Sequence, residues 1–268
     1  MLTETSAIIE KWYKKLSFDP KYDAEFYDAL ARISIPATTN IATYPLEGLD
    51  GKKNLLSFLY MCEDLSAKYA ERGISEEILL DSLSDIVIWC KAWSEYKGEL
   101  FLGETAWVAR TLQFRIFRLG RLQFCMETAG EQLVHCGIQP GEQYLSVHIP
   151  KDGPLDPGAC RQSFAQARAF FLRYFPEFAY TRFSCNSWLL DETLRTLLPE
   201  SSNILQFAKL FRKVDAKESN DIIRFVFGLG VNKENLAQQP CPTRFAQAVK
   251  DGLLASQTFH LTRGLIDR

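Results

Sequence analysis

The residues best suited to acid–base chemistry gather near the middle of the chain, around His148. Residues 144–149 are predicted to form a strand, and the alternation of a strand places Tyr144, Ser146 and His148 on one face. Because an imidazole titrates near neutral pH, a histidine with polar neighbours is suited to act as a general base. The same pattern fits a histidine that hydrogen bonds hold in a structural role, and both interpretations stay open here.

The segment that follows this strand has the features of an anion-binding turn. It reads KDGPLDPGAC (residues 151–160) and leads into a predicted helix. The free N–H groups of a first helical turn and the helix dipole both favour an anion, and Lys151 and Gly153 lie beside them in sequence. However, Pro157 removes one donor, and the Asp156 carboxylate can cap the helix itself. The alternative is an ordinary capped connection between a strand and a helix.

A second polar strand, YTRFSCNSWLL, begins at Tyr180. Tyr180, Ser184 and Asn186 share one face, and Cys185 lies on the other. Polar residues on such a strand either line a cleft or mark a solvated sheet face. Cys185 could act as a nucleophile only with a base beside it and a lowered pKa, and the alternative is a buried structural thiol.

Several classes of site lack support in the sequence. The seven cysteines are widely spaced without a C-x-x-C pair, and there are only three histidines, so we expect no metal site. The G-x-S-x-G, P-loop and G-x-G-x-x-G motifs are absent, which leaves the corresponding hydrolase, NTPase and dinucleotide-binding interpretations without a motif.

Composition and charge point to a globular chain with a small anionic ligand. Of the 268 residues, 47% are hydrophobic, which is enough to build a core. Residues 1–98 hold 11 Lys+Arg against 16 Asp+Glu, whereas the remainder holds 20 against 17. The mild basic excess therefore lies in the half with the predicted anion site, and it is too small for a nucleic-acid surface. We expect no signal peptide, no membrane span and a cytoplasmic location with reduced thiols.

The first hundred residues are predicted to be helical. Ser75 is a suitable N-cap, and Gly73 is a suitable left-handed terminator for the helix before it. The predicted helices cover residues 6–16, 22–33, 51–71 and 75–98, with a connector over 35–51. Four helices with short links favour a helical bundle.

After residue 100 the pattern changes to a mixture of strands and helices. The sequence predicts a β-meander, a long helix capped by Asp156, and then alternating short elements. The predicted strands are 119–126, 132–136, 144–149, 180–189, 221–227 and 258–266, and the predicted helices are 105–117, 157–175, 191–198, 202–211 and 243–254. The expected fold class is α+β, with a helical domain over 1–100 and a mixed domain over 101–268.

Four stretches, taken in this order, resemble a family of two-domain bacterial acyltransferase-like proteins. They are FRLGRLQF (117–124), VHIPKDGPL (147–155), CNSWLL (185–190) and SSNILQF (201–207). In that family a helical N-terminal domain precedes a domain similar to the GCN5-related N-acetyltransferases (GNAT). The resemblance covers nearly the whole chain and matches best over residues 115–211.

The resemblance implies that acyl-CoA is the cosubstrate. In the GNAT fold a central strand leads into a loop and helix N-terminus that bind the pyrophosphate, and the next strand splays away to admit the pantetheine arm. Here these would be residues 144–149, 151–160 and 180–189. The usual signature Gln/Arg-x-x-Gly-x-Gly/Ala is missing from this chain. The residues implied in cofactor binding are Ile149, Lys151, Gly153, Leu155, Gly158, Ala159, Cys160 and Asn186.

Three hypotheses of function follow from these observations. In the first, an unknown amine acceptor attacks the acyl-CoA thioester directly, with His148 as base and Tyr180 or Tyr144 as acid. In the second, the chain is a non-catalytic member of the fold that binds a small molecule, a peptide or a protein. In the third, Cys185 and His148 form an acyl enzyme.

Overall fold

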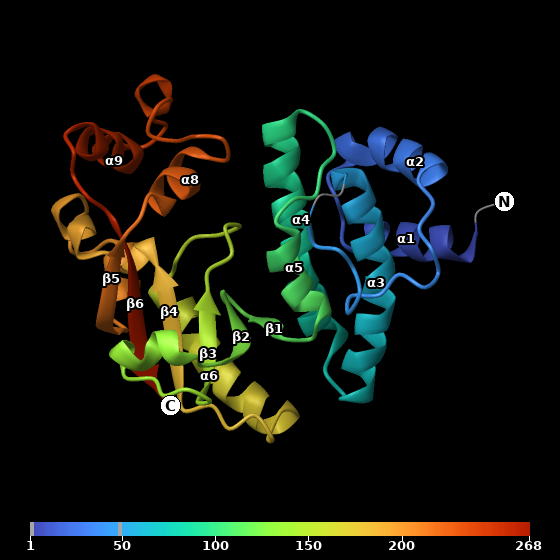
Figure 1. Cartoon of the computed structure of the whole chain (residues 1–268), viewed down its shortest axis with the longest axis horizontal. Helices are drawn as coiled ribbons and strands as arrows, with labels where there is room; N and C mark the ends of the chain where they lie inside the picture. Colours follow the sequence, from blue (N-terminus) through green and yellow to red (C-terminus); the bar gives the residue numbers. More distant parts are fainter. Residues whose placement is uncertain (1–2, 48–49) are drawn as a thin grey trace. The chain divides into compact units, whose positions relative to one another are not determined.

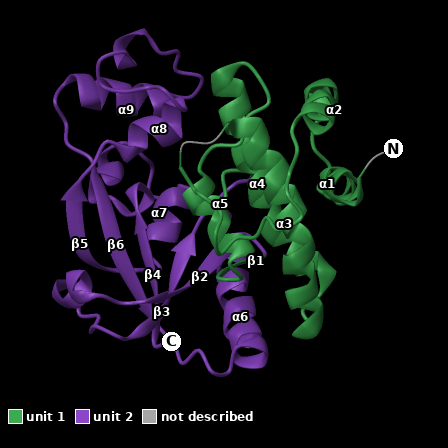
Figure 2. Ribbon diagram, turned by 45° about the vertical axis from the view of Figure 1, so that its right-hand side comes forward, with its two compact units in different colours: residues 1–119, 150–152 green, residues 120–149, 153–268 purple. Residues whose placement is uncertain are grey.

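The computed structural model describes residues 3–47 and 50–268, which divide into two compact units. The first unit comprises residues 1–119 and 150–152, and the second comprises residues 120–149 and 153–268 (Figure 2). The domain boundary expected near residue 100 stays a prediction. Residues 48–49 of the expected connector lie outside the described residues. Among the described helices, none is long and apolar enough to cross a membrane.

The first unit is helical, as the sequence predicts. Each of the four expected helices is present, and both predicted end signals are used. Ser75 accepts a hydrogen bond from the Ile78 N–H, and Gly73 has a φ of 68°. The elements are α1 (Glu4–Lys15), the 3₁₀ helix η1 (Pro20–Tyr22), α2 (Asp23–Arg32), α3 (Gly51–Glu71), α4 (Glu76–Lys97), α5 (Thr105–Leu112) and the short strand β1 (Ile116–Leu119).

Aromatic side chains fill the centre of this unit. Trp12 of α1 is fully buried, and its indole N–H donates to the Glu63 carboxylate of α3 at 2.8 Å. Tyr13 stacks on Phe26 of α2 with the ring centroids 3.6 Å apart. Because the polar tip of Trp12 has a partner, the indole can be buried without an unsatisfied donor. These contacts join α1, α2 and α3 into one bundle.

The second unit is built on a mixed sheet (Figure 1). The five strands of this unit follow the order β2-β3-β4-β6-β5, and each of these pairs is antiparallel except β3 with β4. The strands are β2 (Leu122–Thr128), β3 (Gln143–His148), β4 (Arg182–Ser187), β5 (Arg212–Glu218) and β6 (His260–Asp267). The helices are η2 (Glu131–Cys136), α6 (Pro157–Tyr174), η3 (Trp188–Leu190), η4 (Glu192–Thr196), α7 (Asn203–Ala208), α8 (Asp221–Phe227), η5 (Leu236–Gln238) and α9 (Arg244–Leu254). The helical first part and the mixed, mostly antiparallel sheet confirm the predicted α+β fold class.

Some predicted elements of the second half are wrong. Residues 132–136 form a 3₁₀ helix that ends at Gly137, and residues 221–227 form an α-helix. Both segments are short apolar runs, and periodicity alone cannot separate a buried strand from a buried helix of that length. The helix predicted over 105–117 ends at Leu112, and β1 follows it.

The sequence analysis also missed β5 altogether. This strand reads RKVDAKE, so it lacks the apolar alternation that marks a half-buried strand. It lies at the end of the strand order, and charged side chains are common on such edge strands because they discourage pairing with other chains. An edge position therefore explains why no pattern revealed it.

The two faces of this sheet differ in character. Helix α6 covers one face, where Phe164 packs edge-on against Phe124 of β2 and Phe183 of β4 at centroid distances of 5.7 and 5.1 Å. The strand registers place the next residues on the opposite side, because directly opposed residues share a face. We call that side the polar face; it carries Gln123, Ser146, His148, Ser184, Asn186, Asp215 and Arg263.

Candidate functional site

The parallel pair β3 and β4 is the feature that organises the candidate site. Its paired positions are Leu145 with Phe183 and Ser146 with Ser184, and the ladder has no later pair. Each strand nevertheless continues and stays paired with its other neighbour. β3 pairs with β2 as far as His148, and β4 pairs with β6 as far as Ser187. Two strands that run in the same direction thus stop pairing with each other at their carboxyl ends, which is where the sequence analysis expects the pantetheine arm to enter.

His148 lies at the carboxyl end of β3. It is partly buried, and its Nε2 lies 2.9 Å from the Ser146 hydroxyl on the same face. This hydrogen bond fixes the direction of the imidazole ring. The placement agrees with a general base, and it agrees equally with a structural histidine, so the catalytic role stays a prediction.

Gln123 of β2 is a candidate site residue that the sequence analysis did not single out. It lies directly opposite His148 and is only 2% exposed. Within the described structure its side-chain Nε2 is buried without a hydrogen-bond partner. An unsatisfied buried donor costs about 1–3 kcal/mol, which makes Gln123 a candidate for a hydrogen bond to a ligand. Only the register between β2 and β3 brings Gln123 to His148.

The first turn of α6 is arranged as the sequence predicts. Asp156 is the N-cap and Pro157 occupies the first helical position. The Asp156 carboxylate accepts from the Ala159 N–H at 2.7 Å, and its carbonyl accepts from the Cys160 N–H at 2.9 Å. This leaves the N–H of Gly158 as the one donor of the turn without a partner among the described residues. The helix dipole favours an anion here, whereas the carboxylate of Asp156 opposes one.

Arg121 and Ser163 hold this turn in place. The Arg121 guanidinium donates to the carbonyls of Gly153 and Pro154, each at 2.7 Å. Ser163 of α6 accepts from the Arg121 N–H at 2.8 Å and donates to the Ala159 carbonyl at 3.0 Å. These contacts fasten the loop and the helix start to the beginning of β2. A guanidinium beside the loop also contributes positive charge at the position expected for an anion.

The other residues implied in cofactor binding differ in burial and in their place in the fold. Gly153, Gly158 and Asn186 are exposed, whereas Leu155 and Cys160 are buried. Burial raises the pKa of the Cys160 thiol to about 11, although the charge of Arg121 acts in the opposite direction. Lys151 belongs to the first unit. Ile149 follows β3 directly and Ala159 lies in the first turn of α6; the binding role of all eight residues stays a prediction.

The two tyrosines proposed as acids lie at the other end of the strand pair. Tyr180 precedes β4, is 1% exposed, and packs against Phe171 and Phe183. Burial raises the pKa of its hydroxyl. Tyr144 is the second residue of β3, which puts it about 13 Å from His148 along a strand that rises about 3.3 Å per residue. The structure therefore brings neither tyrosine beside His148, and the identity of the acid stays open.

Cys185 and His148 lie on opposite faces of the sheet. Cys185 is fully buried on the side that α6 covers, and burial raises the pKa of its thiol to about 12. His148 lies on the polar face. Since a nucleophilic cysteine needs a base beside it and a lowered pKa, the arrangement gives the acyl-enzyme hypothesis no support.

Comparison with known proteins identifies the family. The model of the N-acyltransferase N-terminal domain matches residues 3–114, and that of the GNAT-like C-terminal domain matches residues 116–266. The chain belongs to the GNAT-like C-terminal domain family. The resemblance drawn from the four sequence stretches is thereby confirmed. A search of curated proteins finds no match.

Solved structures of acyltransferases are similar to the chain over most of its length. One, in complex with CoA and 10C-teicoplanin, is 29% identical with a TM-score of 0.72, over 80% of this chain and 66% of its own. A second, in complex with decanoyl-CoA and teicoplanin, is 26% identical with a TM-score of 0.73, over 99% and 84%. A third, a mutant acyltransferase in complex with octanoyl-CoA, is 26% identical with a TM-score of 0.74 and the same coverage. The chain thus spans just under two thirds of the first of these proteins and most of the other two.

Proposed function

We propose that this protein is an acyl-CoA-dependent N-acyltransferase that transfers an acyl group to an amine acceptor. The observation that carries the proposal is the parallel strand pair β3–β4, whose ladder ends at Ser146 and Ser184 just before a loop and the start of α6. In the GNAT fold that geometry accommodates the pantetheine arm and the pyrophosphate. The similar acyltransferases in complex with CoA and with acyl-CoA support the same donor.

The proposed reaction needs no covalent enzyme intermediate. The acceptor nitrogen attacks the thioester carbonyl, so that a C–N bond forms and the C–S bond breaks. The nitrogen loses a proton to His148, directly or through a water, and the departing thiolate takes up a proton to give free CoA. Ser146 would keep the imidazole aimed at the acceptor through its 2.9 Å hydrogen bond. The products are an amide and CoA.

Gln123 would supply a hydrogen bond to the reacting group. Its buried Nε2 has no partner in the described structure and lies on the strand opposite His148. A fixed donor in a water-poor site can stabilise negative charge that develops on a thioester oxygen. This role accounts for the presence of an otherwise unfavourable buried amide.

The donor can be tested separately from the acceptor. Thermal shift and calorimetric titration with CoA, acetyl-CoA, octanoyl-CoA and decanoyl-CoA should show saturable binding at one site per chain. Turnover is then followed by chromatography of the released CoA in the presence of a panel of amines, because the seven free thiols would disturb a thiol-reactive colour assay. A well-folded protein that shows no binding at millimolar ligand would contradict the proposal.

One observation favours the second candidate function, a non-catalytic binding protein. The Asp156 carboxylate already caps α6 at the position where the pyrophosphate would bind, and Pro157 contributes no donor. If an amine or a peptide binds but no acyl-CoA does, this function replaces the first.

We also propose a cytoplasmic location. The seven cysteines are all free thiols, and reduced thiols are typical of that compartment. Labelling of the protein inside intact cells with a membrane-permeant thiol reagent would test this.

A further inference from the structure

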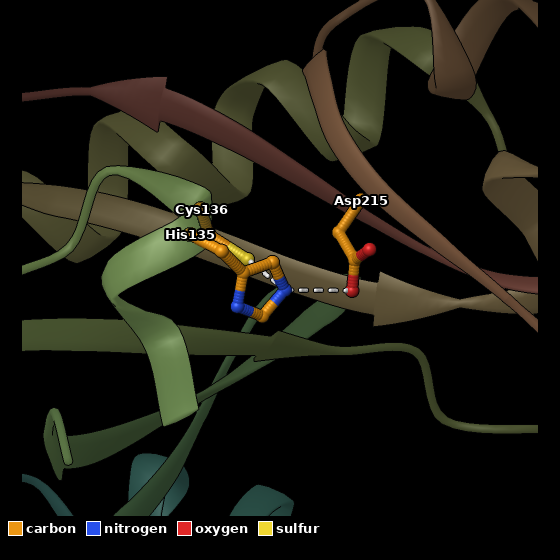
Figure 3. Close-up of side chains that lie close together, drawn as sticks. All are labelled: His135, Cys136 and Asp215. Atoms are coloured by element: carbon orange, nitrogen blue, oxygen red, sulfur yellow. Dashed lines mark hydrogen bonds and ion pairs between the residues drawn. The ribbon is translucent and has the colours of Figure 1, made fainter. Parts of the chain in front are cut away.

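A cluster of three potential metal ligands lies away from the β3–β4 site, on the same polar face of the sheet but at its β5 edge. His135 and Cys136 end the 3₁₀ helix η2, and Asp215 belongs to the edge strand β5 (Figure 3). The ligand atoms of these residues all lie within 4.8 Å of one another. Figure 3 shows that the His135 ring points toward both the Cys136 sulfur and the Asp215 carboxylate. The family resemblance and the predicted acyl transfer assign no role to this cluster.

The local backbone explains why the three side chains converge. Gly137 follows η2 with a φ of 80°, so the chain turns immediately after Cys136. Across from it, the register between β5 and β6 shifts between Lys213 and Asp215. An irregularity of this kind in a strand re-aims the side chains next to it. Both elements thus depart from regular structure at the residues that bring the ligand atoms together.

The bonding pattern argues against a nucleophilic triad. The Cys136 Sγ lies 3.3 Å from Nε2 of His135, and the Asp215 Oδ2 lies 3.2 Å from that same nitrogen. In a Cys–His–Asp relay the thiol and the carboxylate contact different ring nitrogens, so that one orients the ring while the other receives the proton. Two partners on one nitrogen cannot divide those tasks.

The same distances agree with a shared metal ion. With Zn–N and Zn–O bonds of about 2.0–2.1 Å and a Zn–S bond of about 2.3 Å, tetrahedral coordination separates neighbouring ligand atoms by about 3.3–3.6 Å. The observed 3.2 and 3.3 Å are close to this range. Thiolate, imidazole and carboxylate together suit a borderline metal rather than Ca²⁺ or Mg²⁺, which prefer oxygen ligands.

Burial and charge are consistent with such a site. Cys136 is 4% exposed within a cluster formed with Ala129, Leu133, Ile138 and Leu265, whereas the His135 side chain is 59% exposed. The buried Cys136 sulfur is a ligand atom that its apolar neighbours hold in position. The exposed His135 side lets water reach the metal as a fourth ligand.

Arg263 is the charged group that acts against a cation here. It lies opposite Asp215 on β6, and its guanidinium donates to the Ser184 hydroxyl at 2.9 Å. Burial raises the pKa of the Cys136 thiol, and the charge of Arg263 acts in the opposite direction. Once the thiol has lost its proton to a bound metal, Cys136 and Asp215 carry two negative charges against the one positive charge of Arg263. Lys213, which lies beside the register shift of β5, is paired with Glu192.

We propose that His135, Cys136 and Asp215 form a binding site for a divalent transition-metal ion, with Zn²⁺ as the best match. On binding, the Cys136 thiol releases its proton to solvent and the sulfur forms a bond with the metal. The ion joins η2 to the edge strand β5 and stabilises that edge of the sheet. This replaces the expectation from the sequence that the chain has no metal site.

The test is titration of the metal-free full chain with CoCl₂ and then ZnCl₂. We expect one Co²⁺ per chain with a sulfur-to-cobalt charge-transfer band, displacement of that band by Zn²⁺, and a rise in Tm with Zn²⁺. Cys136→Ser should remove the band and weaken binding by roughly 100-fold or more, since even residues that only support metal ligands are worth about 10–100-fold. The matched control Cys241→Ser removes a partly exposed thiol outside the cluster and should behave like wild type.

A second variant keeps the test decisive if loss of the buried sulfur impairs folding. Asp215→Asn changes a partly exposed carboxylate, should leave the fold intact, and should retain the band while weakening Co²⁺ binding by at least about 10-fold. Absence of stoichiometric binding, a bound cobalt without the charge-transfer band, or a band unchanged in Cys136→Ser would each overturn the proposal. Binding and Tm are read without the acyl-transfer assay, so the outcome is independent of the proposed function.

Discussion

The two faces of the sheet in the second unit differ in what their residues do. On the face toward α6, the rings of Phe124, Phe164 and Phe183 pack edge to face. Cys185 is fully buried on the same face. On the polar face, hydroxyl, imidazole and guanidinium groups hydrogen bond to one another, as Ser146 does with His148 along β3 and Arg263 with Ser184 between β6 and β4. The aromatic packing thus lies on one face and the residues proposed for chemistry on the other, so substitutions at Phe183 and at His148 should affect mainly stability and mainly turnover, respectively.

The largest effect is expected from His148→Ala. Loss of a general base typically lowers turnover by about 10²–10⁴-fold. The side chain is only partly buried, so Tm should change little. Steady-state turnover with acyl-CoA and thermal unfolding measure the two quantities in parallel. If turnover is unchanged while Tm falls, His148 is a structural residue, and the proposal that it is the general base is wrong.

Alkylation of Cys185 sharpens the contrast between the faces. With a pKa of about 12 rather than 9.0, this thiol carries about 1000-fold less thiolate below pH 9, and α6 also shields it. Iodoacetamide followed by mass spectrometry should modify the partly exposed Cys241 long before Cys185. Denatured protein, in which every thiol reacts, is the control. Rapid stoichiometric modification of Cys185 would revive the acyl-enzyme hypothesis.

Truncation of Phe183 tests the apolar face. Phe183→Ala should lower the free energy of unfolding by about 3–5 kcal/mol, because the residue is fully buried in the aromatic cluster. Asn186→Ala is the matched control on the same strand but the other face; Asn186 is exposed, so we expect a change within about 0.5 kcal/mol. Urea titration of both variants gives the comparison, and equal losses would contradict the division between faces.

Gln123→Leu should separate function from stability at one buried position. The substitution removes an amide whose Nε2 has no partner in the described structure, so the free energy of unfolding should stay the same or rise. Turnover should fall by about 100-fold, since a hydrogen bond that forms in the transition state is lost. A fall in stability with unchanged turnover would show that the amide serves the fold.

The smallest effect is expected at the start of α6. Asp156→Ser keeps a capping oxygen for the Ala159 N–H but removes the negative charge. Favourable interaction of an anion with a helix start is worth about 0.3–1 kcal/mol, so CoA should bind about 2–5-fold more tightly. Calorimetric titration with CoA measures this. Unchanged or weaker binding would mean that the pyrophosphate does not approach this turn.

Local signals allowed part of this structure to be predicted from sequence. The Asp156–Pro157 pair marks the start of α6, and Ser75 and Gly73 mark helix ends in the first unit, because capping depends on residues within one turn. The strand 144–149 was found for a similar reason, since its alternation is regular.

Features that depend on pairing between distant segments could not be predicted. The charged sequence of β5 gives no strand signal, and DIIRFVF reads equally well as a buried strand or a helix. The position of Gln123 opposite His148 depends on the β2–β3 register, and the convergence of Asp215 on His135 depends on where β5 pairs. Residue types alone do not predict these two contacts, because each depends on the register between strands that are distant in sequence.

The most direct test of the central claim is a crystal structure of the chain with bound CoA. We predict the pantetheine arm between the carboxyl ends of β3 and β4, beyond Ser146 and Ser184, and the pyrophosphate at the Gly158 N–H at the start of α6. CoA bound elsewhere, or strand ends filled by side chains and no CoA at saturating concentration, would contradict the account.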